Sequence, residues 1–255
     1  MATRDEIVSY SNKLLNIGAF KDYAPNGLQV EGKQDIQHIV SGVTASLELI
    51  EAAIAVQADM LLVHHGYFWR NEAAEITGMK YRRIKKLLAH DINLLAYHLP
   101  LDAHPQLGNN AQLAQRLDIQ VEAVMDKQGI GNIGSFTQTH DVASLTEKLT
   151  QVLAHKPLVI AGGTHKIKRI AWCSGGAQNY IEKAVSLGAD AYISGEISES
   201  TIHVAREAGI HYFAAGHHAT ERYGVLSLGE QLKSQFNLQH TFIDCGGISY
   251  QEMLA

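Results

Sequence analysis

The sequence predicts an α/β protein of two related domains, each with a mostly parallel sheet and flanking helices. Three observations support this prediction. Short apolar runs typical of buried strands alternate with amphipathic helical segments along the whole chain. A segment near residue 39 recurs near residue 170. The 255 residues are enough for one large domain or two small ones.

The first half alternates strand, helix, strand, helix, strand. After the first strand, Leu47, Ile50 and Ile54 share one helical face. The next apolar run is short, which is typical of a strand buried on both faces. A basic amphipathic stretch then precedes the third strand. The expected strands are 38–45, 59–63 and 92–97, and the expected helices are 46–57 and 79–90.

The second half repeats this alternation. Asp141 is a suitable N-cap for a helix that begins after it. The stretch 126–140 is rich in glycine and polar residues and marks the predicted boundary between a first domain, 1–125, and a second, 126–255. The last strand is a candidate to return to the first domain's sheet. The remaining expected strands are 169–173, 191–194, 210–215 and 241–244, with helices at 177–187, 199–208 and 222–235.

An internal repeat relates the two halves. Residues 38–66 align without gaps on residues 169–197, with identities that include Ile39 on Ile170 and matching apolar positions between them. Further on, the pair His98 and Asp102 corresponds to His217 and Glu221, each with three residues between. We therefore expect two β-α-β-α-β units, the second a diverged copy of the first.

Composition limits the classes of partner. The net charge of −5 comes from interspersed acidic and basic residues, which argues against a large basic face for nucleic acid. No apolar run is long enough to span a bilayer, and the N-terminus lacks the apolar segment of a signal peptide. The two cysteines, Cys173 and Cys245, are too few for a disulfide framework. The expected compartment is the cytoplasm.

Three segments at the carboxyl ends of predicted strands carry metal-binding side chains. Parallel sheets place ligands at that edge. Imidazole and carboxylate together suit Zn²⁺, Mn²⁺, Fe²⁺ or Ni²⁺. Five such side chains exceed the three that one catalytic zinc needs, and a carboxylate can bridge two ions. Spacing alone leaves open the alternative that these histidines are hydrogen-bonded structural residues. The candidate ligands are His64, His65, Asp102, His217 and Glu221.

Two other features suggest different chemistry. Residues 129–134 match the dinucleotide pattern G-x-G-x-x-G, but they lack a convincing preceding strand and a helix that starts in time. We expect a glycine-rich turn there. Cys173 follows a predicted strand and precedes Ser174, so a nucleophile is conceivable, although a buried structural thiol is the preferred interpretation.

Taken together, these motifs resemble a known family, the GTP cyclohydrolase 1 type 2 homologs, which are toroidal dinuclear-metal proteins. The similarity covers nearly the whole chain, and its length matches the short bacterial members, which lack an inserted domain. The segments that carry the resemblance are Tyr23–Gly32, Val63–Gly66, His98–Asp102, Leu107–Asn110, Ser194–Glu196 and Gly216–Glu221.

The resemblance implies a ring-shaped homohexamer with two divalent metal ions per chain in the cleft between the domains. By position it implies the same five ligands, with Glu221 as the bridge. It also implies that His98 lines the site, where it could shuttle protons. Asn132 stands where the family usually has arginine, so an anion contact there does not carry over.

Three functions remain as hypotheses. The leading one is a metal-dependent hydrolase of a nucleotide or related heterocycle, GTP cyclohydrolase-like by resemblance. The alternative is a non-catalytic metal-binding, ring-shaped assembly protein that holds partners. The third, a dinucleotide-dependent enzyme, rests only on the glycine-rich stretch.

Overall fold

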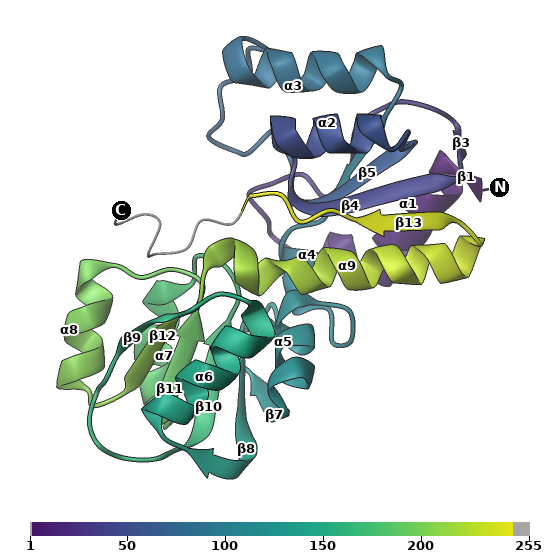
Figure 1. Ribbon diagram of the computed structural model, residues 1–255. Coiled ribbons are helices and arrows are strands. Elements are labelled where there is room, and N and C mark those ends of the chain that lie inside the picture. Colours follow the sequence, from purple (N-terminus) through teal and green to yellow (C-terminus); the bar gives the residue numbers. More distant parts are fainter. Residues whose placement is uncertain (1, 247–255) are drawn as a thin grey trace. The chain divides into compact units, whose positions relative to one another are not determined.

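The computed structural model describes residues 2–246 (Figure 1). The chain divides into two compact units: a first unit of residues 2–101 and 224–245, and a second unit of residues 102–223. It passes from one to the other within α4 (Leu99–Ala103) and again within α9 (His217–Phe236). Within residues 2–246, no helix combines the length and apolarity that a membrane crossing needs.

The first unit is a five-stranded sheet in the order β13-β4-β5-β6-β2. Four strands are parallel, and β2 pairs antiparallel with β6 at one edge. Helices α2 and α3 cover one face, and α1 lies with the last turns of α9 on the other, where Tyr10 contacts Phe236 (Figure 1). A short ribbon pairs β1 with β3. The bounds are β1 Ala2–Thr3, α1 Arg4–Leu14, β2 Gly27–Val30, β3 Asp35–Ile36, β4 His38–Thr44, α2 Leu47–Ala55, β5 Met60–His65, α3 Gly78–Ala89, β6 Asn93–Ala96 and β13 Gln239–Phe242.

The second unit is a six-stranded sheet in the order β7-β8-β10-β11-β12-β9. Its three central strands, β10 to β12, are parallel, and the other pairings are antiparallel. Leucines of α5 and α6 pack with Trp172 and Phe213 on one face, and α7 and α8 cover the other (Figure 1). The bounds are α5 Asn109–Leu117, β7 Ile119–Val124, β8 Asn132–His140, α6 Val142–Leu153, β9 Leu158–Ile160, β10 Ile167–Cys173, α7 Ile181–Ser186, β11 Ala191–Ser194, α8 Glu199–Glu207 and β12 His211–Ala214.

The structure divides the chain at different places from those the sequence suggested. Residues 102–125 belong to the second unit because Leu113 and Leu117 of α5 are buried in its core and β7 pairs with β8. The glycine-rich stretch expected as a boundary contains β8, which lies inside the second sheet. At the other end of the chain, β13 pairs parallel with β4 in the first sheet.

The predicted repeat holds at the level of strand register. Ile39 lies opposite Met60, and the aligned Ile170 lies opposite Ala191. The third strand keeps the same relation, with Met60 opposite Asn93 and Ala191 opposite His211. In both sheets an antiparallel strand, β2 or β9, closes the edge next to the third strand. The two α/β units are therefore related copies.

An aspartate at the amino end of the second repeat strand also recurs, buried in the first unit as Asp59 and partly exposed in the second as Asp190. Asp59 accepts hydrogen bonds at 2.9 and 3.0 Å from two consecutive backbone amides that begin β4. Asp190 accepts two bonds of 2.8 Å from the aligned amides that begin β10. In both units, one carboxylate thus ties the amino ends of two neighbouring strands together.

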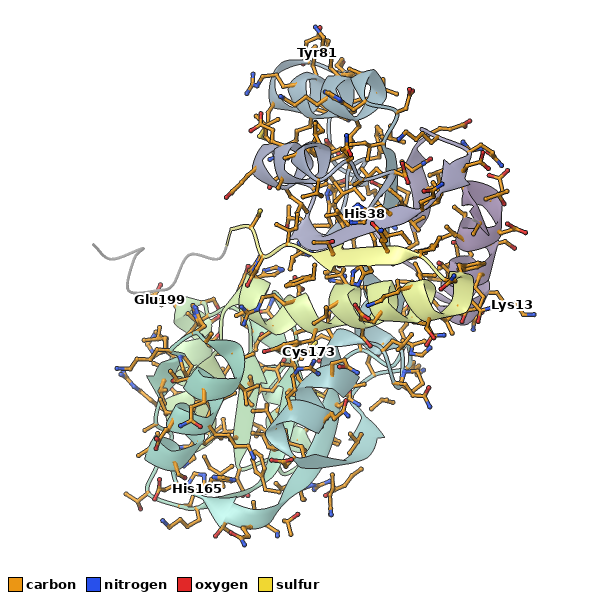
Figure 2. All side chains as sticks on the ribbon, turned by 45° about the vertical axis from the view of Figure 1, so that its right-hand side comes forward. Lys13, His38, Tyr81, His165, Cys173 and Glu199 are labelled. Atoms are coloured by element: carbon orange, nitrogen blue, oxygen red, sulfur yellow. The ribbon has the colours of Figure 1, made fainter. Side chains whose placement is uncertain are left out.

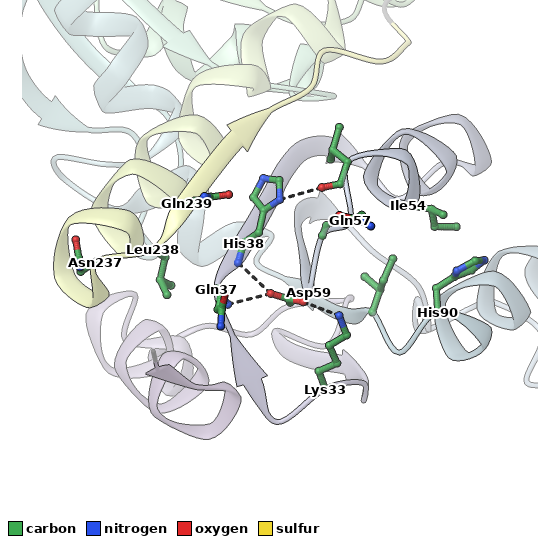
Figure 3. Close-up of a pocket in the computed structure, with 13 residues that line it drawn as sticks. Lys33, Gln37, His38, Ile54, Gln57, Asp59, His90, Asn237, Leu238 and Gln239 are labelled. Carbon is green, nitrogen blue, oxygen red and sulfur yellow. Dashed lines mark hydrogen bonds and ion pairs between the residues drawn. The ribbon is translucent and has the colours of Figure 1, made fainter.

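In the first unit this carboxylate borders a cavity of about 970 Å³ at the amino ends of β4 and β5 (Figure 3). There Lys33 Nζ donates to Asp59 at 2.7 Å, and His38 bonds the Val56 carbonyl at 3.2 Å. Parallel sheets bind ligands at the carboxyl ends of their strands, which is the opposite edge. We therefore treat this cavity as part of the scaffold.

Replacement of Asp59 by asparagine is expected to destabilise the protein by about 1.5–3 kcal/mol at pH 7, the usual contribution of hydrogen bonds to a charged group. Burial alone raises the pKa of Asp59, but bonds from Lys33 and the two amides outweigh it and lower the pKa below 3.8. Because the folded-state pKa is lowered, the stabilisation is present at neutral pH and disappears as pH falls below about 4.

Urea unfolding of wild type and Asp59→Asn at pH 7 and pH 3 measures this difference. The control is Glu51→Gln, which removes a half-exposed carboxylate that pairs with Lys86 at 3.0 Å and should cost less than about 1 kcal/mol. An equal loss for both variants at pH 7 would show that the Asp59 hydrogen bonds add no special stability.

Candidate metal centre

Two histidines stand at the carboxyl end of β5. The preceding residues of this strand, Met60 to Val63, are fully buried on both faces. His64 is also buried and His65 is partly exposed, with ring centroids 4.7 Å apart. Gly66 follows, and a Cβ on it would meet the Gln29 side chain at 2.1 Å. The chain therefore passes close to Gln29 directly after the histidine pair.

His98 joins this pair from the end of the neighbouring strand. It comes after β6, and its ring lies 5.0 Å from that of His64 and 5.8 Å from that of His65. Each of the three offers one ring nitrogen, and these atoms all lie within 4.8 Å of one another. The structure thus brings together three of the histidines that the sequence singled out.

Hydrogen bonds fix the orientation of these rings. The Nδ1 atom of His64 lies 2.9 Å from the Tyr97 carbonyl oxygen, and that of His98 lies 2.9 Å from an Asp22 oxygen. A carbonyl or carboxylate oxygen can only accept, so Nδ1 carries the proton and Nε2 keeps its lone pair. His65 Nδ1 bonds the Thr44 hydroxyl at 3.1 Å. Held this way, His64 and His98 can bind a metal through Nε2.

Asp22 is a site residue that the sequence analysis did not identify. Its carboxylate accepts bonds from His98, from the Asn26 side chain and from the backbone amides of Tyr23, Ala24 and Leu99. Burial raises the pKa of Asp22, but the bonds from His98 and Asn26 outweigh it and lower the pKa to about 2. Asp22 is therefore ionised at neutral pH and orients His98. Its place directly before the Tyr23–Gly32 motif was the available signal.

In the second unit, Asp102 is buried and held by two donors. Its Oδ1 accepts from Asn109 at 2.9 Å and from the Ser174 hydroxyl at 2.8 Å. Asn110 bonds the Asp102 carbonyl and also accepts from the Ser174 amide. The Leu107–Asn110 motif therefore fixes this carboxylate against the end of β10.

His217 and Glu221 lie one turn apart at the start of α9, directly after β12. His217 Nε2 lies 3.2 Å from Glu221 Oε2, and its Nδ1 lies 2.7 Å from Glu196 Oε1. Burial lowers the pKa of His217, but Glu221 and then Glu196 outweigh it and raise the pKa to about 9. The position between His217 Nε2 and Glu221 thus favours positive charge, which a divalent cation also supplies.

Cys173 does not suit a nucleophile. Its side chain is buried at the carboxyl end of β10. His165 lies at the other end of that sheet and is far from the thiol (Figure 2). Burial raises the pKa of the thiol well above its usual value, and the charges of Asp102 and Glu221 raise it further. A thiol that stays protonated is a poor nucleophile. The interpretation as a structural thiol agrees with the structure.

The glycine-rich stretch 129–134 has a structural explanation too. Gly134 lies in β8, where a Cβ would come within 2.2 Å of the Gln120 carbonyl oxygen of β7. The next helix, α6, begins only at Val142. A dinucleotide site needs a helix N-terminus at the phosphates, and none lies here. The stretch instead forms the expected turn, with a φ of 79° at Gly129 and 72° at Gly131, and then the start of β8.

The donors in each unit fit divalent metal ions. The first unit offers imidazole Nε2 atoms, and the second offers an imidazole beside buried carboxylates. Mixed nitrogen and oxygen donors are typical of Zn²⁺, Mn²⁺, Fe²⁺ and Ni²⁺ sites. The carboxylates of Asp22 and Glu196 accept hydrogen bonds from the Nδ1 atoms of His98 and His217. Carboxylates in this position typically orient metal-binding histidines.

Glu196→Ala is expected to weaken metal binding about 10- to 100-fold, the usual effect of losing a residue that orients a metal-binding histidine. Glu196→Gln keeps an acceptor for His217 Nδ1 and should retain most of the affinity. Competition with a chromophoric chelator measures both variants. Glu199→Ala, at an exposed position on α8 (Figure 2), is the control. Unchanged affinity in Glu196→Ala would show that Glu196 does not orient His217.

Comparison with known proteins agrees with this description. Residues 2–246 match the family model of Duf34/NIF3 (NGG1p interacting factor 3). A Yersinia pestis protein named GTP cyclohydrolase 1 type 2 homolog is 55% identical over 240 residues, which cover 94% of this chain and 96% of the relative. The structure of protein ybgI, described as of unknown function, has a TM-score of 0.93 at 49% identity, covering 96% and 98% of the two chains. Protein TTHA1606 from Thermus thermophilus has a TM-score of 0.88 at 33% identity, with the same coverage.

Proposed function

Because the chain belongs to the Duf34/NIF3 family, we propose that it is a metal-dependent hydrolase acting on a nucleotide or related heterocycle. The observation that carries this proposal is the cluster of His64, His65 and His98, whose ring nitrogens converge within 4.8 Å. The relatives named GTP cyclohydrolase 1 type 2 homologs support a nucleotide as the substrate class.

We propose two divalent ions per chain, Zn²⁺, Mn²⁺, Fe²⁺ or Ni²⁺, with five ligands. His64 and His65 come from the first unit, and Asp102, His217 and Glu221 come from the second. Glu221 would bridge the two ions, because its side chain is longer than that of Asp102 at the equivalent repeat position. When bound, such ions lower the pKa of water and polarise the group under attack.

His98 is the proposed general acid–base. Its Nδ1 proton is held by the ionised Asp22, so Nε2 can accept a proton from attacking water and return it to the leaving group. Asp22 stabilises the imidazolium that forms in between. Asp22 accepts five hydrogen bonds, one of which comes from His98. Together they hold the carboxylate in place and keep the His98 ring from rotating, so the same ring nitrogen performs both proton transfers.

The proposal extends to assembly and location. By resemblance to its family, we place the protein in the cytoplasm as a ring-shaped homohexamer. The interspersed charges and net charge of −5 give no reason to expect nucleic acid as a partner.

A second function has one observation in its favour. The family description names a member as an interacting factor of another protein, NGG1p. A metal-stabilised assembly that binds partners without catalysis would need the same ligands. It would not need an oriented proton carrier such as His98.

Turnover separates the two proposals. Metal-reconstituted protein is tested on a panel of nucleoside mono-, di- and triphosphates with Mn²⁺, Zn²⁺ or Fe²⁺. We expect hydrolysis of at least one substrate. His98→Gln should lower that rate about 10²- to 10⁴-fold, the usual contribution of acid–base catalysis, and keep its metal content. No turnover with any of the metals would reject the hydrolase and favour the partner-binding protein.

A further inference from the structure

Two aromatic side chains flank His98 in the first unit. The rings of Tyr23 and Trp69 each lie 5.1 Å from the His98 ring, in edge-to-face geometry. They lie 5.8 Å from each other at an interplanar angle of 34°. Trp69 also lies 5.9 Å from His65. The pair therefore stands next to the proposed acid–base and to a proposed metal ligand.

The loops that carry this pair are fastened to each other. The Arg70 amide donates to the Tyr23 carbonyl at 2.8 Å, and its guanidinium donates to the Asp22 carbonyl at 2.8 Å. The Trp69 indole N–H donates to the Gly66 carbonyl at 3.2 Å. Phe68 has a φ of 65°, a strained conformation for an aromatic residue. Such strain is typical of functional loops held by their surroundings.

Burial does not account for the arrangement. Tyr23 remains 52% exposed, although its ring takes part in the cluster. Aromatic side chains in a core are usually covered, whereas a cluster of exposed aromatic side chains rimmed by polar groups is typical of a ligand-binding surface. A planar heterocycle is the ligand class that suits such a surface, because any base offers a π-face for stacking.

We propose that Tyr23 and Trp69 form an aromatic platform on which the heterocyclic ring of the substrate stacks beside His98. This inference rests on the proposed function and deepens it, since it names the part of the substrate that is recognised. Stacking would hold a heterocyclic ring next to His98, but it does not determine which bond of the substrate is hydrolysed. The platform should therefore bind a base even where no reaction follows.

Tryptophan fluorescence tests the platform directly. The chain has two tryptophans, and Trp172 is fully buried in the second unit. Metal-free protein is titrated with guanosine 5′-monophosphate and, as a probe without a base, ribose 5-phosphate. We expect the first probe alone to quench the fluorescence, and Trp69→Phe to abolish the response.

Variants at Tyr23 separate the effect of ring stacking from the effect of side-chain size. Tyr23→Phe keeps the ring and should bind the nucleotide like wild type, whereas Tyr23→Leu should bind about tenfold more weakly. Tyr81→Leu, at an exposed position on α3 (Figure 2), is the matched control. Thermal unfolding of each variant confirms that the fold is retained.

The outcomes distinguish this inference from the proposed function. Quenching that depends on Tyr23 and Trp69, without turnover under any metal, rejects the hydrolase and supports the platform. Equal quenching by both probes, or equal affinity of Tyr23→Leu and wild type, overturns the platform. That result would leave any measured turnover standing.

Discussion

Glu221→Gln is expected to remove both metal ions from the reconstituted protein, whereas Asp102→Asn leaves one in place. A carboxylate that bridges two ions offsets charge on both, so neutralising it weakens both sites. Glu221 is 2% exposed, so little solvent is present to replace its charge. Its Oε2 atom also lies 3.2 Å from His217, a second proposed ligand.

Asp102 differs in its surroundings. Its Oδ1 already accepts bonds from Asn109 and Ser174, which suits a carboxylate that serves a single ion. Both substitutions keep the shape of the side chain, so packing changes little and the effect of charge dominates.

Elemental analysis after identical reconstitution measures the two variants, and circular dichroism confirms their fold. Glu230→Gln, which alters a carboxylate on a later turn of α9, is the control and should keep two ions. Retention of both ions in Glu221→Gln, together with their loss in Asp102→Asn, would mean that the two carboxylates have exchanged roles.

Gly175→Ala is expected to abolish metal binding by the second unit's ligands without removing any of them. Gly175 follows β10 with a φ of 65°, and a Cβ there would lie 2.1 Å from Glu221 Oε1 and 3.2 Å from His217 Nε2. The carboxylate would have to move away from its position. The backbone would also carry about 1–2 kcal/mol of strain, the usual cost of a left-handed conformation with a side chain.

A matched glycine separates the effect of displacing the Glu221 carboxylate from the effect of backbone strain. Gly188 has a φ of 72°, but a Cβ there would meet only Arg169, at 3.5 Å. Gly188→Ala should therefore lose similar stability and keep its metal. Calorimetric titration with Mn²⁺ and thermal unfolding are measured for both variants. Equal metal affinity in the two would show that Glu221 is not needed in its present position.

The sequence predicted the repeated part of the fold well because the repeat has a strong periodic signal. Buried apolar strands alternate with amphipathic helices, and two copies of one pattern support each other. The aligned registers of Ile39 and Ile170 confirm that relation.

The start of α9 differs from the prediction. Gly216, with a φ of 90°, ends the turn after β12, and α9 begins directly at His217. The helix expected at 222–235 thus starts five residues earlier, inside the Gly216–Glu221 motif.

Other elements could not be predicted because their cause is tertiary. Strand β8 contains glycine at a position where β7 approaches too closely for a side chain, so its sequence resembles a loop. The orienting roles of Asp22 and of Glu196, which lies in the Ser194–Glu196 segment that carries the family resemblance, were not predicted for a related reason. Asp22 lies 76 residues from His98, and Glu196 lies 21 residues from His217. No local pattern links such partners.

The central claim is that the five ligands hold two metal ions, and metal stoichiometry tests it most directly. Protein stripped with chelator and reconstituted with excess Mn²⁺ or Zn²⁺ is freed of unbound metal and analysed by mass spectrometry for metal per chain. We predict two ions per chain in wild type, and fewer in His64→Ala and in His65→Ala. A wild-type stoichiometry that never exceeds one, or undiminished binding in both histidine variants, would contradict the dinuclear centre.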